Sequence, residues 1–225
     1  MLIGGFQKFT LSDFPGRSAA IVFTRGCNFQ CPWCHNHELI DPCVHDLPGE
    51  SSPPDSLSII RFLEKRAGLL DGVVITGGEP TIQKGLQDFI HRVRTLGYMV
   101  KLDTNGSQPE VLADLIDKGI VDYFAMDIKA PFYKYGILAG KQVDLDSIRR
   151  SIELLACSGV PHEFRTTHVP DLLSESDILD LSSLVPPGSR WTVQKYREHP
   201  EKTGEPHITS TPESQNPELF LHFSL

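Results

Sequence analysis

Short apolar runs alternate with amphipathic segments through most of this 225-residue chain. The apolar runs predict strands buried on both faces, over residues 19–24, 72–76, 98–102, 121–128, 163–169 and 191–196. The amphipathic segments predict helices over 56–66, 83–96, 107–116, 146–156 and from about 174 onward. This alternation implies right-handed βαβ units and a parallel sheet. Periodicity leaves both an open doubly wound sheet and a barrel possible.

The length of the chain favours one domain over residues 1–225, with a lead-in strand or hairpin in 1–18 and a tail over 197–225. A formal net charge of −8 without any basic run argues against a nucleic-acid partner. No apolar stretch approaches the roughly 18 residues needed to cross a membrane. An odd number of cysteines, five, without a secretion signal predicts a cytoplasmic protein.

Three of the cysteines stand in the stretch Cys27–Cys34, with spacing C-x3-C-x2-C, directly after the predicted strand 19–24. Iron–sulfur sites usually have four cysteines, and zinc ligands usually come as two separated pairs. Zinc could take His35 or His37 as a fourth ligand. Alternatively, a loop with three thiolates leaves one iron of a four-iron cubane open for a non-protein ligand. Cys43 and Cys157 are interpreted as ordinary thiols, with Cys157 in the core.

Polar motifs follow the other predicted strands. In Gly77-Gly78-Glu79-Pro80, the glycines let a backbone approach a ligand closely and Glu79 offers an acceptor to an ammonium group. Asp103 and Asp127 stand at the ends of two further strands, where they would repel each other unless a cation or a lysine lies between them. Arg165 on the fifth strand suits a carboxylate.

The ordered set GCN…CPWCHN, TGGEPT, LDTNGS, MDIKAP and EFRTT resembles the radical S-adenosylmethionine (SAM) superfamily. Within it, the chain looks most like the activating proteins of anaerobic ribonucleoside-triphosphate reductase, with pyruvate formate-lyase activating enzyme as a close relative. The resemblance implies a partial (βα)6 TIM-like barrel, in which the chemistry lies in loops at the carboxyl ends of the strands.

The resemblance also implies cofactors and their ligands. Cys27, Cys31 and Cys34 would be the ligands of a [4Fe-4S] cluster, whose open iron binds SAM, and would act in catalysis through it. The residues implied to bind SAM, or a monovalent cation beside it near Asp103 and Asp127, are Trp33, His35, Gly77, Gly78, Glu79, Asp103, Thr104, Asp127, Lys129 and Arg165. A histidine that relatives often have on the sixth strand is absent here, and Gln194 is expected to take its place.

The implied activity is one-electron reductive cleavage of SAM, followed by hydrogen abstraction from a glycine of a glycyl-radical enzyme. The implied partners are anaerobic ribonucleotide reductase and, as electron donor, reduced flavodoxin or ferredoxin. Three alternatives stay open: a pyruvate formate-lyase-type activating enzyme, a radical SAM enzyme acting on a small molecule such as a deazaguanine precursor, and a zinc-stabilised binding module. The aromatic loop with Phe132, Tyr133 and Tyr135 is predicted to dock the partner enzyme.

Overall fold

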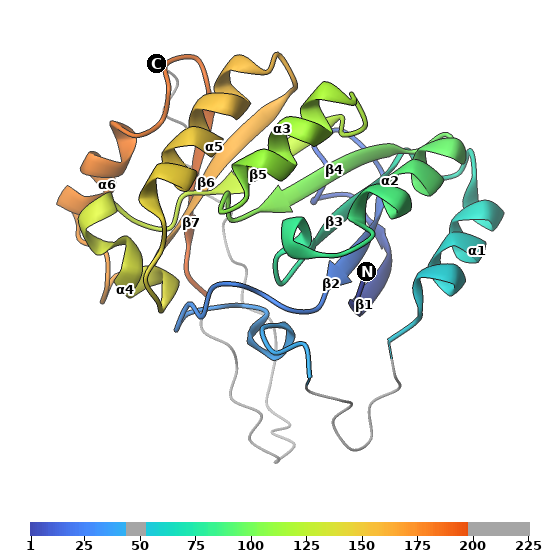
Figure 1. Ribbon diagram of the computed structural model, residues 1–225, viewed down its shortest axis with the longest axis horizontal. Coiled ribbons are helices and arrows are strands. Elements are labelled where there is room, and N and C mark those ends of the chain that lie inside the picture. Colours follow the sequence, from blue (N-terminus) through green and yellow to red (C-terminus); the bar gives the residue numbers. More distant parts are fainter. Residues whose placement is uncertain (44–52, 198–225) are drawn as a thin grey trace, which may run out of the picture.

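The computed structural model describes residues 1–43 and 53–197 (Figure 1). Their strands form one sheet in chain order, with β1 antiparallel to β2 and all later pairs parallel. The strands are β1 (Ile3–Thr10), β2 (Ala19–Thr24), β3 (Gly72–Gly77), β4 (Met99–Thr104), β5 (Tyr123–Asp127), β6 (His162–His168) and β7 (Arg190–Lys195). The six predicted strands are confirmed, and the lead-in contributes β1 at one edge.

The α-helices follow the parallel strands. They are α1 (Ser56–Arg66), α2 (Leu86–Thr95), α3 (Pro109–Asp117), α4 (Tyr135–Ala139), α5 (Leu145–Cys157) and α6 (Glu175–Ser182). The described residues also form short 3-10 helices, namely η1 (His37–Leu39), η2 (Pro80–Ile82) and η3 (Phe132–Lys134). The five predicted helices are confirmed, and this α/β architecture is the expected partial TIM-like barrel.

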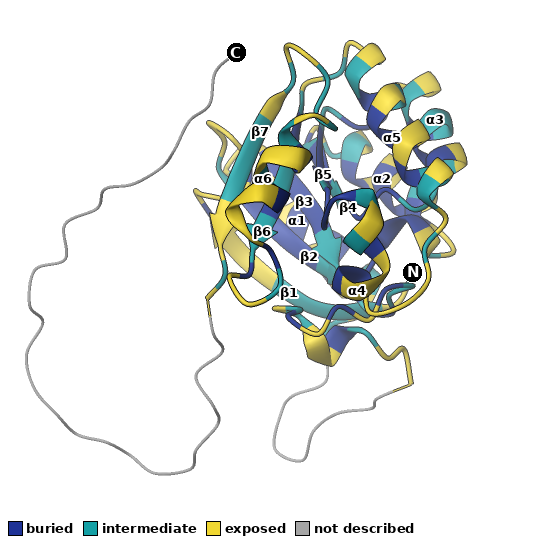
Figure 2. Cartoon of the chain, turned by 90° about the vertical axis from the view of Figure 1, so that its left-hand side faces the viewer, coloured by how far each residue is buried: buried dark blue, intermediate teal, exposed yellow. Residues whose placement is uncertain are grey.

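Side chains alternate between the two faces of the sheet, because successive residues of a strand point to opposite sides. On β4, Val100 and Leu102 belong to the large core between the sheet and the helices. Figure 1 shows α2, α3 and α5 together on that outer side, and Figure 2 shows their exposed faces turned away from the buried strands. Lys101 and Asp103 alternate with these residues along β4, so their side chains face the inside of the barrel, where the functional residues gather.

The inner face is apolar towards the amino ends of the strands and charged towards their carboxyl ends. Phe14 packs there with Ala19, Ile21 and Val74 in a small second core. Charged side chains of β4, β5 and β6 continue the same face. A barrel of this kind therefore has a closed end, and its chemistry is confined to the opposite end.

Two local predictions are wrong. Ser107 does not cap α3, whose N-cap is Gln108, because the Ser107 hydroxyl instead accepts a hydrogen bond from the Asn28 side chain at 2.7 Å. Cys157 is exposed at the last turn of α5 rather than buried in the core. The second predicted capping box, of Ser174 with Asp177 at the start of α6, is confirmed.

The predicted loop between β5 and α5 contains η3 and the five-residue helix α4, which sequence periodicity did not indicate. Residues 198–225, and with them nearly all of the predicted tail, lie outside the described residues, and the single-domain assignment stays a prediction. Within residues 1–43 and 53–197, no helix is long and apolar enough to span a membrane.

Candidate active site

The cysteine loop follows β2 and is held against the loop after β3 by backbone contacts. Gly78 donates to the carbonyl of Thr24 at 2.9 Å, and Glu79 donates to that of Gly26 at 2.9 Å. A Cβ on Gly77, whose φ is +112°, would lie 2.4 Å from the Thr24 nitrogen, and one on Gly78 would lie 2.2 Å from the Gly26 oxygen. The two glycines therefore make room for the strand end and the cysteine loop, a role that their sequence did not distinguish from ligand approach.

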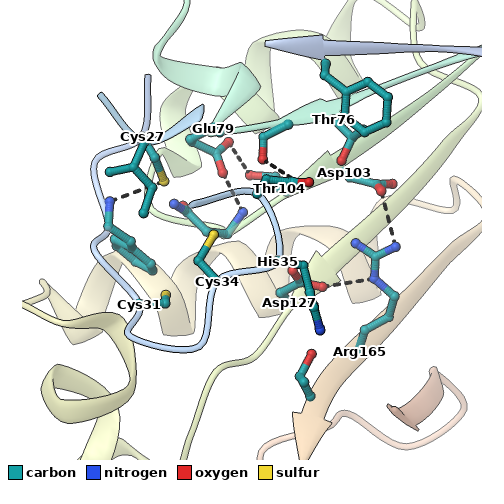
Figure 3. Close-up of a pocket in the computed structure, with 18 of the residues that line it drawn as sticks. Cys27, Cys31, Cys34, His35, Thr76, Glu79, Asp103, Thr104, Asp127 and Arg165 are labelled. Atoms are coloured by element: carbon teal, nitrogen blue, oxygen red, sulfur yellow. Dashed lines mark hydrogen bonds and ion pairs between the residues drawn. The ribbon is translucent and has the colours of Figure 1, made fainter. Parts of the chain in front are cut away.

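Cys27, Cys31 and Cys34 line one side of a cavity of about 370 Å³ at the carboxyl ends of the strands (Figure 3). Burial raises the pKa of all three thiols, that of Cys27 to about 12. The Phe29 amide donates to the Cys27 sulfur at 3.3 Å. Cys31 is buried and the other two thiols are half-buried. A coordinated metal ion would remove the proton of each thiol.

This donor set fits an iron–sulfur cluster. In residues 1–43 and 53–197, no group of three His, Cys, Asp or Glu side chains is placed to hold a single metal ion. A cluster held by three cysteines would take these three thiols, which line the same cavity, as its protein ligands. The indole nitrogen of Trp33, beside Cys34, is buried and has no hydrogen-bond partner among the described residues.

Glu79 is buried at the centre of a hydrogen-bond hub. Its Oε1 accepts from the Thr81 hydroxyl at 2.6 Å and the Thr104 hydroxyl at 2.8 Å. Its Oε2 accepts from the Asn105 amide at 2.7 Å. Burial raises the pKa of this carboxyl, although the hydrogen bonds that it accepts lower the pKa in part. A ligand cation in the cavity would favour the charged form of the carboxyl.

The opposite side of the cavity carries a chain of alternating charges. Arg165 joins the two aspartates, with its Nε 2.9 Å from Asp127 Oδ1 and its Nη1 3.2 Å from Asp103 Oδ2 (Figure 3). Lys101 pairs with Asp103 at 2.6 Å, and Lys129 pairs with Asp127 at 2.9 Å. The positive charge that two converging carboxylates require is therefore supplied by protein side chains. A monovalent cation at this place stays a prediction.

The strand register explains how Arg165 reaches Asp103. Asp127 lies directly beside Arg165 on the neighbouring strand, whereas Asp103 is two strands away and in register with Ala125 of the strand between them. Because Ala125 is small, the arginine side chain can cross β5 on the inner face. The nearby cations Arg165 and Lys129 lower the pKa of Asp127, and its carboxylate in turn raises the pKa of Lys129.

The chain of charges ends at the cysteine loop. Lys129 Nζ lies 5.0 Å from the ring centroid of Trp33, a cation–π contact. His35 lines the cavity, and its ring lies 5.3 Å from that of Tyr196. Gln194 of β7 also lines the cavity, which agrees with the position expected for it. All predicted site residues thus lie at this end of the barrel.

The predicted aromatic docking surface is only partly exposed. Tyr135 is fully buried, and its ring packs on Phe29 of the cysteine loop. Tyr133 is exposed, but its hydroxyl donates to Asp177 and Asp180 of α6. A surface formed by all three aromatics is therefore wrong, because Tyr135 belongs to the barrel core.

Two polar contacts that the sequence did not reveal hold the cysteine loop against the loop after β4. The Asn28 side chain donates to Ser107 at 2.7 Å and accepts from the Asn105 side chain at 2.9 Å. Asparagine is common in turns, so that only the spatial pairing identifies this role.

Replacement of Asn28 by alanine should lower the free energy of unfolding by about 1–3 kcal/mol, because it leaves the Ser107 and Asn105 groups without their partner. Urea unfolding measures this change. Asn36→Ala is the matched control, since the side chain of this asparagine in the same loop makes one long hydrogen bond within the described residues, 3.4 Å to the Gly77 carbonyl. Equal losses in both variants would contradict a specific role for Asn28.

Comparison with known proteins agrees with this site. The profile of the Radical SAM superfamily matches residues 21–184. A Methanocaldococcus jannaschii protein, whose name assigns it provisionally to the glycyl-radical enzyme activating enzymes, is 34% identical over 200 residues, covering 87% of this chain and 80% of that protein. The 7-carboxy-7-deazaguanine synthase of Methanopyrus kandleri is 31% identical over 132 residues, 52% of each chain.

Among solved structures, Streptococcus suis SuiB bound to S-adenosylmethionine has a TM-score of 0.55 at 16% identity, covering 82% of this chain and 41% of SuiB. At this identity the likeness shows the fold alone. A partial barrel with a three-cysteine loop at the mouth of a charged cavity is the scaffold of an iron–sulfur enzyme. The chain belongs to the radical SAM superfamily. Membership implies a [4Fe-4S] cluster and SAM as cofactors, and it excludes the zinc module.

Proposed function

We propose that this radical SAM enzyme activates a glycyl-radical enzyme, with anaerobic ribonucleoside-triphosphate reductase as the partner. The observation that carries the proposal is the 34% identity over 87% of the chain to a relative named for glycyl-radical enzyme activation. The match to a deazaguanine synthase covers only 52% of the chain. The motifs LDTNGS and MDIKAP, at the ends of β4 and β5, support the same assignment.

The cavity offers each part of SAM a complementary group. Cys27, Cys31 and Cys34 would hold the cluster. Glu79 would accept hydrogen bonds from the ammonium group of SAM, since its carboxylate follows the glycine pair and lines the cavity. Arg165 would bind the carboxylate of SAM. The other residues proposed to bind SAM are Trp33, His35, Gly77, Gly78, Asp103, Thr104, Asp127 and Lys129.

When bound and supplied with an electron by reduced flavodoxin or ferredoxin, the cluster would provide the one-electron reductive cleavage of SAM to methionine and a 5′-deoxyadenosyl radical, and that radical would remove a hydrogen atom from the glycine. The chain positions the cofactors and shields them from water. The cysteine loop, the buried Glu79 and the paired carboxylates fix the ligand groups before SAM arrives, so that binding requires little rearrangement.

Electron paramagnetic resonance tests the proposal. Anaerobic incubation of the reconstituted enzyme with SAM, reductant and an anaerobic ribonucleotide reductase should produce a glycyl-radical signal in the reductase. A signal only with a pyruvate formate-lyase-type enzyme would support the proposed reaction but show that the proposed partner is wrong. Absence of a signal with both enzymes, together with turnover of a deazaguanine precursor, would contradict the proposal.

A further inference from the structure

Lys101 is a buried cation that the proposed SAM contacts do not use. It lies in the middle of β4 with 2% of its surface exposed. Its neighbours in register are Val74 on β3 and Tyr123 on β5, neither of which carries a carboxylate. Its counter-ion is Asp103, whose Oδ1 is 2.6 Å from Lys101 Nζ. In the described part of the chain, Asp103 lines the cavity whereas Lys101 lies behind it.

Packing alone does not explain a lysine at this position. Burial of an ion pair costs desolvation energy, and replacing such a pair by apolar residues is often neutral or stabilising. The inner face beside Lys101 already holds an apolar cluster that includes Val74. An apolar pair would fit that cluster better. A role in the site therefore explains the Lys101–Asp103 ion pair better than packing does.

The charges of the paired side chains that run from Lys101 to Lys129 do not cancel. Lys101, Arg165 and Lys129 contribute three positive charges, while Asp103 and Asp127 contribute two negative charges. Glu163, the next carboxylate along this face, is balanced by Arg190 at 3.7 Å, so the net charge is +1. Lys101 makes the shorter contact with Asp103, 2.6 Å, and Arg165 makes the longer one, 3.2 Å. Asp103 is therefore neutralised mainly from behind. Arg165 retains positive charge towards the cavity that it lines.

We propose that Lys101 is a positioning residue that neutralises Asp103 and thereby keeps Arg165 available for the carboxylate of SAM. Without Lys101, these side chains would have no net charge, and Arg165 would be the one cation left in contact with Asp103. The inference rests on the proposed function only in that Arg165 binds the SAM carboxylate. It requires no glycyl-radical partner.

Calorimetry on the reconstituted, unreduced enzyme tests the inference with two ligands that differ only in the carboxylate: SAM and decarboxylated SAM. Lys101→Met should weaken the binding of SAM by about ten-fold, the scale of a Coulomb interaction inside a protein. Binding of decarboxylated SAM should change by less than about two-fold. The matched control is Lys118→Met, which removes a 2.8 Å ion pair with Asp114 on the surface of α3 and should alter neither affinity.

Equal weakening of both ligands would show that Lys101 only supports the barrel, and unchanged binding of SAM would show that Arg165 does not depend on it. Either result overturns the inference. Should Lys101→Met fail to fold, Lys101→Gln keeps a polar group beside Asp103 but removes the charge, and it should lose the preference for SAM over decarboxylated SAM to the same extent. A preference within about two-fold of that of the unmodified enzyme would contradict the inference. Because no partner enzyme is present, these outcomes are independent of whether a glycyl radical forms.

Discussion

Each of the substitutions Cys27→Ala, Cys31→Ala and Cys34→Ala should reduce the iron content from about four atoms per chain to near zero. The three thiols line one cavity, and no other cysteine lines it in the described part of the chain. A cubane with two protein ligands is expected to dissociate, since the third thiolate has no substitute. Iron analysis and the visible absorption of the anaerobically reconstituted protein measure the loss.

Cys43→Ala and Cys157→Ala are the matched controls, because both residues are exposed and lie outside the cavity. Each control should retain its full iron content. Loss of iron in the Cys43 variant would show that the ligand set extends beyond the three-cysteine loop, and would contradict the site as described.

Arg165→Met should lower the free energy of unfolding by about 3–5 kcal/mol at pH 7, the cost of removing one partner from a buried ion pair. The variant leaves Asp103 and Asp127, which lie on the neighbouring strands β4 and β5, with only one lysine each. Urea unfolding measures the loss. Arg150→Met is the control, since its 2.5 Å pair with Glu110 is exposed and should contribute less than about 1 kcal/mol.

The loss in Arg165→Met should depend on pH. In the unmodified protein the pKa of Asp127 is lowered by Arg165 and Lys129, so its stabilisation is fully present above its unfolded pKa of about 4 and is lost only below it. In the variant Asp127 loses that cation, its pKa rises, and its protonation relieves the repulsion as the pH falls. The difference in unfolding free energy should therefore shrink between pH 8 and pH 5. A constant difference would assign the effect of Arg165 to packing.

The order of strands and helices could be predicted because each strand has a continuous apolar run and each longer helix has apolar residues at helical spacing. Parallel strands also place their carboxyl ends at one edge, so that Glu79, Asp127 and the cysteine loop could be expected to meet. The short helix α4 could not be predicted, since five residues are too few to show a helical period. The burial of Tyr135 follows from its contact with the cysteine loop and leaves no sign in the local sequence.

Pairings between strands were also beyond the sequence. A lysine within the apolar run of β4 was visible at position 101, but its contact with Asp103 depends on the parity of the strand. The bridge from Arg165 to Asp103 depends in addition on a small residue, Ala125, in the intervening strand. The roles of Gly77 and Gly78 in the approach of two backbones likewise required the positions of β2 and β3.

Transfer of deuterium tests the central claim most directly. A partner reductase labelled with deuterium at the α-carbon of its glycines is incubated anaerobically with the reduced enzyme and SAM, and the 5′-deoxyadenosine formed is analysed by mass spectrometry. If this chain removes a hydrogen atom from a partner glycine, the 5′-deoxyadenosine carries one deuterium, and its amount equals that of the glycyl radical. 5′-Deoxyadenosine without deuterium, formed at the same rate whether or not the partner is present, would contradict the account.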